Sequence, residues 1–320
     1  MQLHEHTQAD GHLDTLSGPR RGPFWSVISE EVYEVPLNAR EIKRRIKSFT
    51  KTAQITKAME MVSAAKLRRV QESVQHSKPY LAKMEQMLAG VSASARYVKH
   101  PLLSTRPVRR TGYLIVTADR GLAGAYNAQI IRTALQELRK KDKASYTIYA
   151  VGRRGSDFFK RHGYPVAGEI IGLSDSPTYS SVSHLASQIV SAYAAEEFDE
   201  LYFVYNEFIN AVTQRPVLKK VLPLSDVGES TTPNRVNYLY EPDAETVLQA
   251  LLPRYAETLV YQAVLDAKAS EHAARMTAMG NATDNAKEMI ADLTLSLNRA
   301  RQAAITTQIV EVVSGAQALQ

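Results

Sequence analysis

Residues 282–304 read ATDNAKEMIADLTLSLNRARQAA, and no proline follows Pro253 to the end of the chain. Alanine, leucine and methionine recur here every three or four positions, at Ala282, Ala286, Met289, Leu293, Leu297, Ala300 and Ala304. This spacing places them along one face of a helix. A single helix of roughly 60 residues would be about 90 Å long. The many alanines predict close packing against a second helix.

A second long helix is predicted near the start of the chain. Neither proline nor glycine occurs between Pro36 and Pro79. Apolar residues first recur in steps of four, three and four, at Ile42, Ile46, Phe49 and Ala53. The same step then repeats two positions out of phase, at Ile55, Met59 and Val62, which predicts that the apolar seam shifts around the helix. Because neither helix can bury its seam alone, we expect the two to pair antiparallel as a coiled coil.

Between the two helices the pattern changes to that of strands. Three runs are rich in apolar, β-branched and aromatic residues: 112–118, 146–151 and 200–206. Helical patterns fill the gaps at 127–141, 153–162 and 183–197. Alternation of strand and helix predicts a small, mostly parallel α/β domain. The expected fold is therefore a mixture of α/β and coiled coil, in which a globular domain is inserted between two long helices.

These patterns predict four regions. They are an N-terminal extension (1–36, expected to be disordered), an N-terminal coiled-coil helix (37–95), an α/β domain (110–235) and a C-terminal coiled-coil helix (245–320). Residues 223–245, with three prolines, are expected to form a loop.

Composition excludes several classes of function. The chain has no cysteine, which excludes disulfides, thiol catalysis and cysteine-rich zinc sites. No apolar run approaches the roughly 20 residues needed to cross a bilayer. Residues 1–35 lack the apolar core of a secretory signal, and their acidic residues argue against an organellar transit peptide. The net charge of +6 indicates an acidic partner.

Much of the positive charge is concentrated on the first long helix. Its basic residues are Lys43, Arg44, Arg45, Lys47, Lys51, Lys57, Lys66, Arg68 and Arg69. Acidic residues at four-residue spacing, which would stabilise such a helix, are scarce. We therefore expect this surface to face an acidic partner. A coiled-coil nucleic-acid binder is an alternative, although the stretch has a single aromatic residue, Phe49, for stacking on bases.

A glycine-containing turn, 117–127 (TADRGLAGAYN), follows the first predicted strand. In α/β folds such turns can hold phosphates at a helix N-terminus, so an enzyme that binds nucleotides is a second alternative. The sequence matches neither the dinucleotide-binding fingerprint nor the P-loop. A structural turn with glycines at positive φ is the better interpretation.

No catalytic or metal-binding set is defined by the remaining polar residues. His4 and His6 form a pair within the N-terminal extension, which is weak evidence for a metal site. Four carboxylates, Asp119, Glu169, Asp199 and Glu311, are isolated in the pattern and are expected to be surface or capping groups. We expect no catalytic residue, cofactor or metal.

Three stretches together resemble the gamma subunit family of F-type ATP synthases. The first stretch, near the start, contains 39–46 (AREIKRRI) and 54–68 (QITKAMEMVSAAKLR). The second, in the middle, is 117–127. The third, at the end, contains 275–286 (RMTAMGNATDNA), 298–306 (NRARQAAIT) and 311–316 (EVVSGA). They occur in the right order, and the resemblance covers about residues 37–320.

The resemblance implies a central rotor shaft without a catalytic site of its own. In this family the end helices wind together inside a ring of three alpha and three beta subunits, and a Rossmann-like domain contacts epsilon and the ring of membrane c subunits. Such a shaft couples proton flow and rotation of the c-ring to conformational changes in the catalytic ring. The resemblance also implies a peripheral protein on the cytoplasmic face of the bacterial plasma membrane, with no nucleic-acid partner.

The resemblance also implies partner-contact residues. Met59 matches the position where the shaft meets an acidic lever of the beta subunit, and Lys57 and Arg68 add positive charge beside it. On the C-terminal helix, Arg301, Gln302 and Thr306 match positions that contact a catch loop of beta. An apolar tip resembles the end that turns inside the hydrophobic sleeve of the ring; its residues are Ile309, Val310, Val312, Val313, Ala316 and Leu319. The alternative for the tip is an ordinary coiled-coil end.

Two departures from the family pattern are present. The family usually begins close to Pro36, so residues 1–35 are either an extension or the product of a wrongly chosen start codon. The plastid version carries a cysteine pair, and because this chain has no cysteine, that thiol control cannot operate here.

Overall fold

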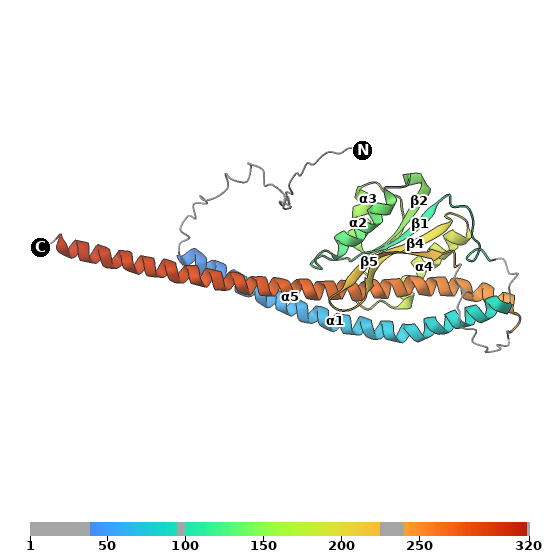
Figure 1. Ribbon diagram of the computed structural model, residues 1–320, viewed down its shortest axis with the longest axis horizontal. Coiled ribbons are helices and arrows are strands. Elements are labelled where there is room, and N and C mark those ends of the chain that lie inside the picture. Colours follow the sequence, from blue (N-terminus) through green and yellow to red (C-terminus); the bar gives the residue numbers. More distant parts are fainter. Residues whose placement is uncertain (1–38, 95–99, 225–239, 319–320) are drawn as a thin grey trace, which may run out of the picture. The chain divides into compact units, whose positions relative to one another are not determined.

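The computed structural model describes residues 39–94, 100–224 and 240–318. The N-terminal extension, the part of the α/β domain predicted at 225–235, and Leu319 lie outside these residues. The chain divides into two units, residues 44–296 and residues 1–43 with 297–320. The sheet and the parts of the two long helices within residues 44–296 belong to the first unit (Figure 1).

Two long helices begin and end the described chain. Helix α1 spans Ala39–Ser94 and contains Pro79. Helix α5 spans Ala244–Gln317 and contains Pro253. The C-terminal helix was predicted at 245–320 from a pattern free of proline only after Pro253, and Leu248 and Leu252 before that proline are buried helical residues. Their packing outweighs the backbone hydrogen bond that the proline removes.

Helices α1 and α5 lie antiparallel, as predicted. Three hydrogen bonds join them: Thr56 to Thr283 (2.7 Å), Ser77 to Gln262 (2.8 Å) and Tyr255 to Glu85 (3.1 Å). Between the first two pairs, Leu67 and Val70 of α1 pack against Ala269 and Ala273 of α5. The small alanine side chains leave room for the larger residues of α1.

The predicted shift of the seam along α1 is wrong. The inward face continues in phase through Thr56, Ser63, Leu67 and Val70. Two polar residues therefore occupy seam positions, and their hydroxyl groups are satisfied: Thr56 bonds Thr283, and Ser63 donates to the carbonyl of Met59. Because a hydrogen-bonded hydroxyl is tolerated in a buried position, apolar periodicity alone gave the wrong phase.

The seam on α5 follows the prediction up to Ala300, except at Met289. Thr283 and Ala286 are buried and Ile290 is half-buried, whereas Met289, which was expected on the seam, is 50% exposed. Ala282, Leu293, Leu297 and Ala300 are half-buried on the predicted face, and Ala304 is exposed.

The inserted domain contains a five-stranded sheet with the order β3-β2-β1-β4-β5. Its strands are β1 (Thr111–Val116), β2 (Tyr146–Val151), β3 (Val166–Ile170), β4 (Glu200–Phe208) and β5 (Gln214–Leu222). The first four are parallel, and β5 pairs antiparallel with β4. Helices α2 (Tyr126–Leu138), α3 (Arg153–Arg161) and α4 (Tyr179–Ala194) connect the parallel strands, with a short 3-10 turn, Lys143–Ser145, before β2.

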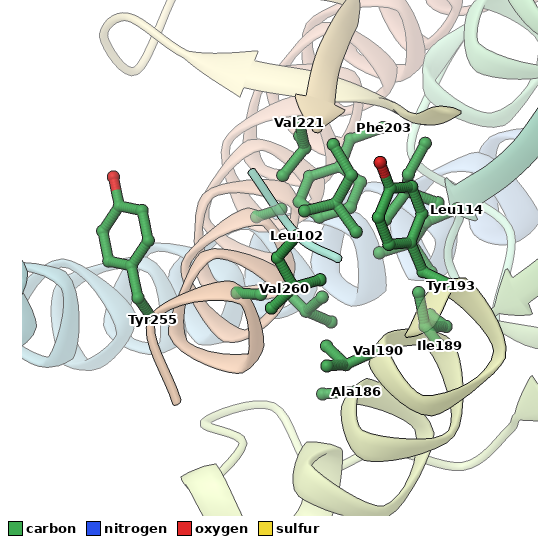
Figure 2. Packing of buried hydrophobic residues seen from close by; sticks show 14 of the residues in the cluster. Leu102, Leu114, Ala186, Ile189, Val190, Tyr193, Phe203, Val221, Tyr255 and Val260 are labelled. Carbon is green, nitrogen blue, oxygen red and sulfur yellow. The ribbon is translucent and has the colours of Figure 1, made fainter. Parts of the chain in front are cut away.

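Both faces of the sheet are covered, which explains the continuous apolar runs of β1 and β2. Tyr113 and Ile115 of β1 pack with α2 and α3. Leu114 and Val116 point to the other face, where α4, α5 and the end of α1 enclose a larger core. Figure 2 shows side chains of this core converging from the sheet, α4 and α5.

Strands β3 and β5 were not predicted from the sequence. Strand β3, at one edge of the sheet, alternates between half-buried and exposed residues. Strand β5 contains Pro216, Lys219 and Lys220 and forms the other edge. Proline and lysine are common on edge strands, which need no second partner, but they weaken the apolar alternation that identifies a strand.

The α/β domain is joined to the long helices by side-chain contacts. Tyr126 of α2 donates to the carbonyl of Ala267 (2.9 Å), and Tyr261 of α5 donates to the carbonyl of Pro177 (3.1 Å). Tyr179 of α4 donates to Glu257 of α5 (2.6 Å). These contacts add to the core that α1 and α5 share with the sheet.

Asp199 fixes the chain where it enters β1. Its carboxylate accepts hydrogen bonds from the Arg106 guanidinium (2.7 Å) and from the backbone N–H groups of Arg109 (2.7 Å) and Arg110 (3.0 Å). Burial alone would raise the pKa of Asp199, but these hydrogen bonds hold the pKa below its usual value. The residue predicted to be a surface or capping group is thus a buried structural carboxylate.

Candidate partner-binding surfaces

An apolar stripe on α1 lies beside the face that packs on α5. Ile55, Met59 and Val62 follow one another in steps of four and three, and Ile55 and Val62 are 60% and 52% exposed. Met61 beside them is 58% exposed, while Met59 is half-buried. These are the residues that the sequence analysis placed on a displaced seam. Their spacing does form one helix face, and that face is available to a partner.

Met59 also lies at the edge of a cavity of about 320 Å³ between α1, α5 and the turn after β1. Charged and titratable side chains line much of this cavity: Lys66, Arg120, Asp175, Glu271, His272 and Arg275. Sequence reasoning identified neither Asp175 nor the charged residues of α5. The latter lie on consecutive turns of α5, and only tertiary packing shows that they are buried.

A buried ionic network extends from this cavity along α5. Glu271 accepts from Lys268 (3.0 Å) and from Arg275 (2.8 Å), and all three side chains are nearly or fully buried. Arg275 also reaches the carbonyl of Gly121 in the turn after β1 (3.4 Å). A bridging carboxylate between two cations satisfies charges that would be costly to bury alone. The network therefore fixes the turn against α5.

His272 and Asp175 form the second part of this cavity. Lys66 of α1 forms an ion pair with Asp175 (2.7 Å), and the other carboxylate oxygen lies 3.6 Å from Nε2 of His272. Burial opposes ionisation of Asp175, but the hydrogen bond and charge of Lys66 keep its pKa below the usual value. Burial lowers the pKa of His272 despite the nearby carboxylates. We infer that His272 is neutral at pH 7.

The basic residues expected to contact a partner lie on the surface of α1. Lys57 is exposed and forms an ion pair with Glu60 (3.1 Å), which reduces the charge that it presents. Arg68 is exposed and has no ion pair within the described residues. Of the predicted cluster, Lys66 is thus used within the fold, whereas Arg68 remains available.

The C-terminal segment of α5, residues 301–318, is exposed at every position. It includes five large apolar residues that are 45–72% exposed: Ile305, Ile309, Val310, Val312 and Val313. Contiguous apolar surface of this kind marks an interaction site in a soluble protein. Arg301 and Gln302 lie at its start, and Thr306 donates to the carbonyl of Gln302 (3.0 Å) within the helix.

The turn after β1 uses its polar groups within the fold. Asp119 accepts from the backbone N–H groups of Arg153 (2.9 Å) and Gly172 (3.0 Å), and Asn127 accepts from Ala118 (2.9 Å). The Asp119 carboxylate thus accepts from the first residue of α3, so this helix N-terminus already has an anionic partner within the fold. Both glycines of the turn, Gly121 and Gly124, were expected at positive φ. Gly124 has positive φ, but Gly121 does not, and Leu122 does. The geometry supports a structural turn, with one of its two glycines wrongly assigned.

Among the described residues, no helix is long and apolar enough to cross a membrane. Nor do these residues contain a group of three or more histidine and carboxylate side chains placed to hold a metal ion.

Comparison with known proteins identifies the family. A family model described as ATP synthase matches residues 38–319. The ATP synthase gamma chain of Brevibacillus brevis (strain 47 / JCM 6285 / NBRC 100599) is 50% identical over 281 residues, which cover 87% of this chain and 98% of that one. The chain belongs to the ATP synthase gamma-chain family.

Solved structures agree with this fold. A chain in the central stalk and c-ring structure of Tetrahymena thermophila mitochondrial ATP synthase is 25% identical, with a TM-score of 0.56, covering 71% of this chain and 99% of that chain. A chain of the Euglena gracilis mitochondrial ATP synthase, in a structure that includes OSCP, F1 and the c-ring, has a TM-score of 0.61 at 18% identity, covering 88% of this chain and 94% of that chain. At that identity the likeness concerns the fold alone.

The fold expected for this chain, two paired helices with an inserted α/β domain, is confirmed. The domain boundaries and the contact residues stay predictions. Sequence reasoning also missed the exposure of Ile55 and Val62, for which the signal was present: their four-three spacing is out of phase with the preceding seam.

Proposed function

We propose that this gamma chain is the central rotor shaft of a proton-translocating ATP synthase and acts on the catalytic beta subunits through two surfaces of its long helices. As a gamma chain it is a non-catalytic subunit, so its effect on ATP chemistry depends on contacts that change with rotation. A rotating asymmetric body biases each partner only if it contacts different rotational states differently. Because the two surfaces differ in chemistry, a beta subunit would meet different contacts as the shaft turned.

The first surface surrounds Met59 on α1. The exposed side chains of Ile55 and Val62 supply apolar contact area beside it, and Lys57 and Arg68 supply positive charge. We propose that this surface contacts an acidic lever of the beta subunit. Mixed apolar and cationic surfaces suit such a partner because the charge orients the approach and the apolar residues supply burial.

The second surface is the end of α5, and its exposure is the observation that carries the proposal. All described residues from Arg301 onward are exposed, including five large apolar side chains. Arg301, Gln302 and Thr306 are assigned to the catch loop of beta. The tip, comprising Ile309, Val312, Val313 and Ala316 among the described residues together with Leu319, is assigned to the apolar sleeve of the alpha and beta ring. Apolar side chains lack directional bonds, which suits a surface that must turn.

The remaining partners follow from the same assignment. The α/β domain would contact epsilon and the c-ring, and the complex would place the chain on the cytoplasmic face of the bacterial plasma membrane as a peripheral subunit. Through these contacts the subunit would regulate both ATP hydrolysis and proton flow.

The test is reconstitution with alpha and beta subunits, followed by coupling measurements in the complete enzyme. Arg301→Ala with Gln302→Ala should lower ATP-driven proton pumping per ATP hydrolysed several-fold, because two contacts of the rotating helix are removed. The matched control is Asn298→Ala with Arg299→Ala, which removes the same charge from exposed positions of the same helix. Wild-type coupling in the first variant would contradict the contact assignment. A chain that failed to form any ATP-hydrolysing complex would contradict the rotor assignment itself.

A further inference from the structure

A groove between α2 and α3 lies outside both shaft surfaces. These helices lie side by side on the face of the sheet away from α5 (Figure 1). The groove has a volume of about 800 Å³. Its apolar floor consists of half-buried side chains, Ile131, Leu135 and Phe158. The His162 ring lies 4.3 Å from the Phe158 ring and extends this floor.

Four arginines line the same groove. Arg132 and Arg139 come from α2 and its C-terminal end, and Arg154 and Arg161 come from α3. Within each helix the two arginines are seven residues apart, so they lie about 10.5 Å from one another on the same side of the helix. One acidic residue, Asp157, shares the groove with them.

These four guanidinium groups are unusual because they have no ion pair or side-chain hydrogen bond within the described residues. Other cations on the same helices do have partners: Lys140 binds Glu137 (2.8 Å), and Lys160 binds Glu169 (2.6 Å). Glu137 and Glu169, which pair with these lysines, lie outside the groove, and Asp157 is the one acidic residue that lines it. The groove therefore holds four arginines and one carboxylate, an excess of positive charge that is not neutralised within the described residues.

We propose that the α2–α3 groove binds an acidic segment of a partner protein, one that carries carboxylates about 10 Å apart with an apolar residue between them. Arginine forks bind carboxylates in bidentate geometry, and arginine with aromatic residues is enriched at the centres of protein interfaces. The apolar floor accepts the intervening side chain.

The shape and chemistry favour protein over other anionic partners. Nucleic acid would need a series of aromatic platforms for base stacking, whereas the groove offers one phenylalanine and one histidine. A membrane surface would favour protruding side chains, but here the apolar residues lie in a recess between two helices. This surface is independent of the proposed contacts with beta, because it shares no residue with them.

The experiment is photo-crosslinking in the assembled complex. Leu135 on the groove floor is replaced by a benzophenone amino acid, and the crosslinked product is identified by mass spectrometry. The matched control carries the same amino acid at Gln129, which is exposed on α2 but does not line the groove. We expect the Leu135 probe alone to capture a protein segment rich in aspartate or glutamate.

Charge dependence is the second readout. Arg132→Gln with Arg161→Gln should lower the crosslinking yield about fivefold, and 0.5 M salt should have a similar effect, since exposed ion pairs contribute modestly and are screened. Both arginines are exposed, and an unchanged thermal unfolding transition of the double variant would show that the fold is intact. No crosslink, a crosslink to lipid or to a segment without carboxylates, or a yield insensitive to both changes would each overturn the proposal.

Discussion

Val312, at the exposed end of α5, allows a quantitative test of whether a partner covers this segment. The side chain is 72% exposed, and full burial of a valine is worth about 1.5–3 kcal/mol. Covering Val312 in a sleeve would therefore contribute about 1–2 kcal/mol. Replacing it with aspartate removes this contribution and places a carboxylate in an apolar environment, which adds a penalty. We expect Val312→Asp to weaken the complex by at least about 2 kcal/mol, roughly a 30-fold faster dissociation.

The free energy of unfolding of the isolated chain should change much less. Valine and aspartate have similar helix propensity, and substitutions at exposed positions usually change stability by less than about 0.5 kcal/mol. The assay compares dissociation of the reconstituted alpha–beta–gamma complex, followed by analytical ultracentrifugation, with unfolding of the chain alone, followed by circular dichroism. Val312→Leu is the matched control, because it keeps the apolar character and should dissociate like the wild type. Equal dissociation rates for Val312→Asp and Val312→Leu would refute the reasoning.

Two further predictions concern the fold. Gly280→Ala should stabilise the protein by about 1 kcal/mol in urea unfolding, because glycine is unfavourable inside a helix and the added Cβ would lie at an ordinary 3.7 Å from the Glu60 carboxyl carbon; a loss of stability would show that this reasoning omits a clash. Asp199→Asn should cost about 3 kcal/mol at pH 7, because two backbone N–H groups would face an amide instead of a carboxylate oxygen. Burial opposes the low pKa of Asp199, but its hydrogen bonds, including that from Arg106, lower it overall, so its contribution is present at neutral pH and is lost as pH falls through the folded-state pKa. A difference between wild type and variant that was the same at pH 7 and pH 3 would contradict this.

The sequence predicted the long helices and the central strands well because their signals are local. The apolar runs of β1 and β2 reflect burial on both faces, and the lack of any proline after Pro253 reflects a continuous helix. The strand β5 was missed because an edge position tolerates Pro216, which a central strand would not.

The phase of the α1 seam could not be predicted from apolar periodicity. Thr56 and Ser63 face inward because each hydroxyl has a partner, and for Thr56 that partner, Thr283, is far along the chain. Ile55 and Val62, which look like core residues by type, are left outside. The face of α1 that is buried is thus the one whose hydroxyl groups are hydrogen-bonded, and the more apolar face beside it is exposed.

The charged groups of the Met59 cavity were missed for a related reason. Glu271 is one of many acidic residues in a helical pattern, and nothing local distinguishes it from a surface residue. Its burial depends on Lys268 and Arg275 on neighbouring turns and on the turn after β1, which packs against them. Such a network is defined by tertiary structure alone.

The side-chain contacts between the α/β domain and the long helices bear on how torque passes through this molecule. The chain enters the domain from α1 and returns from it to α5, and hydrogen bonds from Tyr126, Tyr179 and Tyr261 join the domain to α5 at separate points. A single flexible linker would let the domain turn with slack before the helices followed. Here a twist applied to the domain would be shared between several lateral contacts and the core that the sheet forms with α1 and α5.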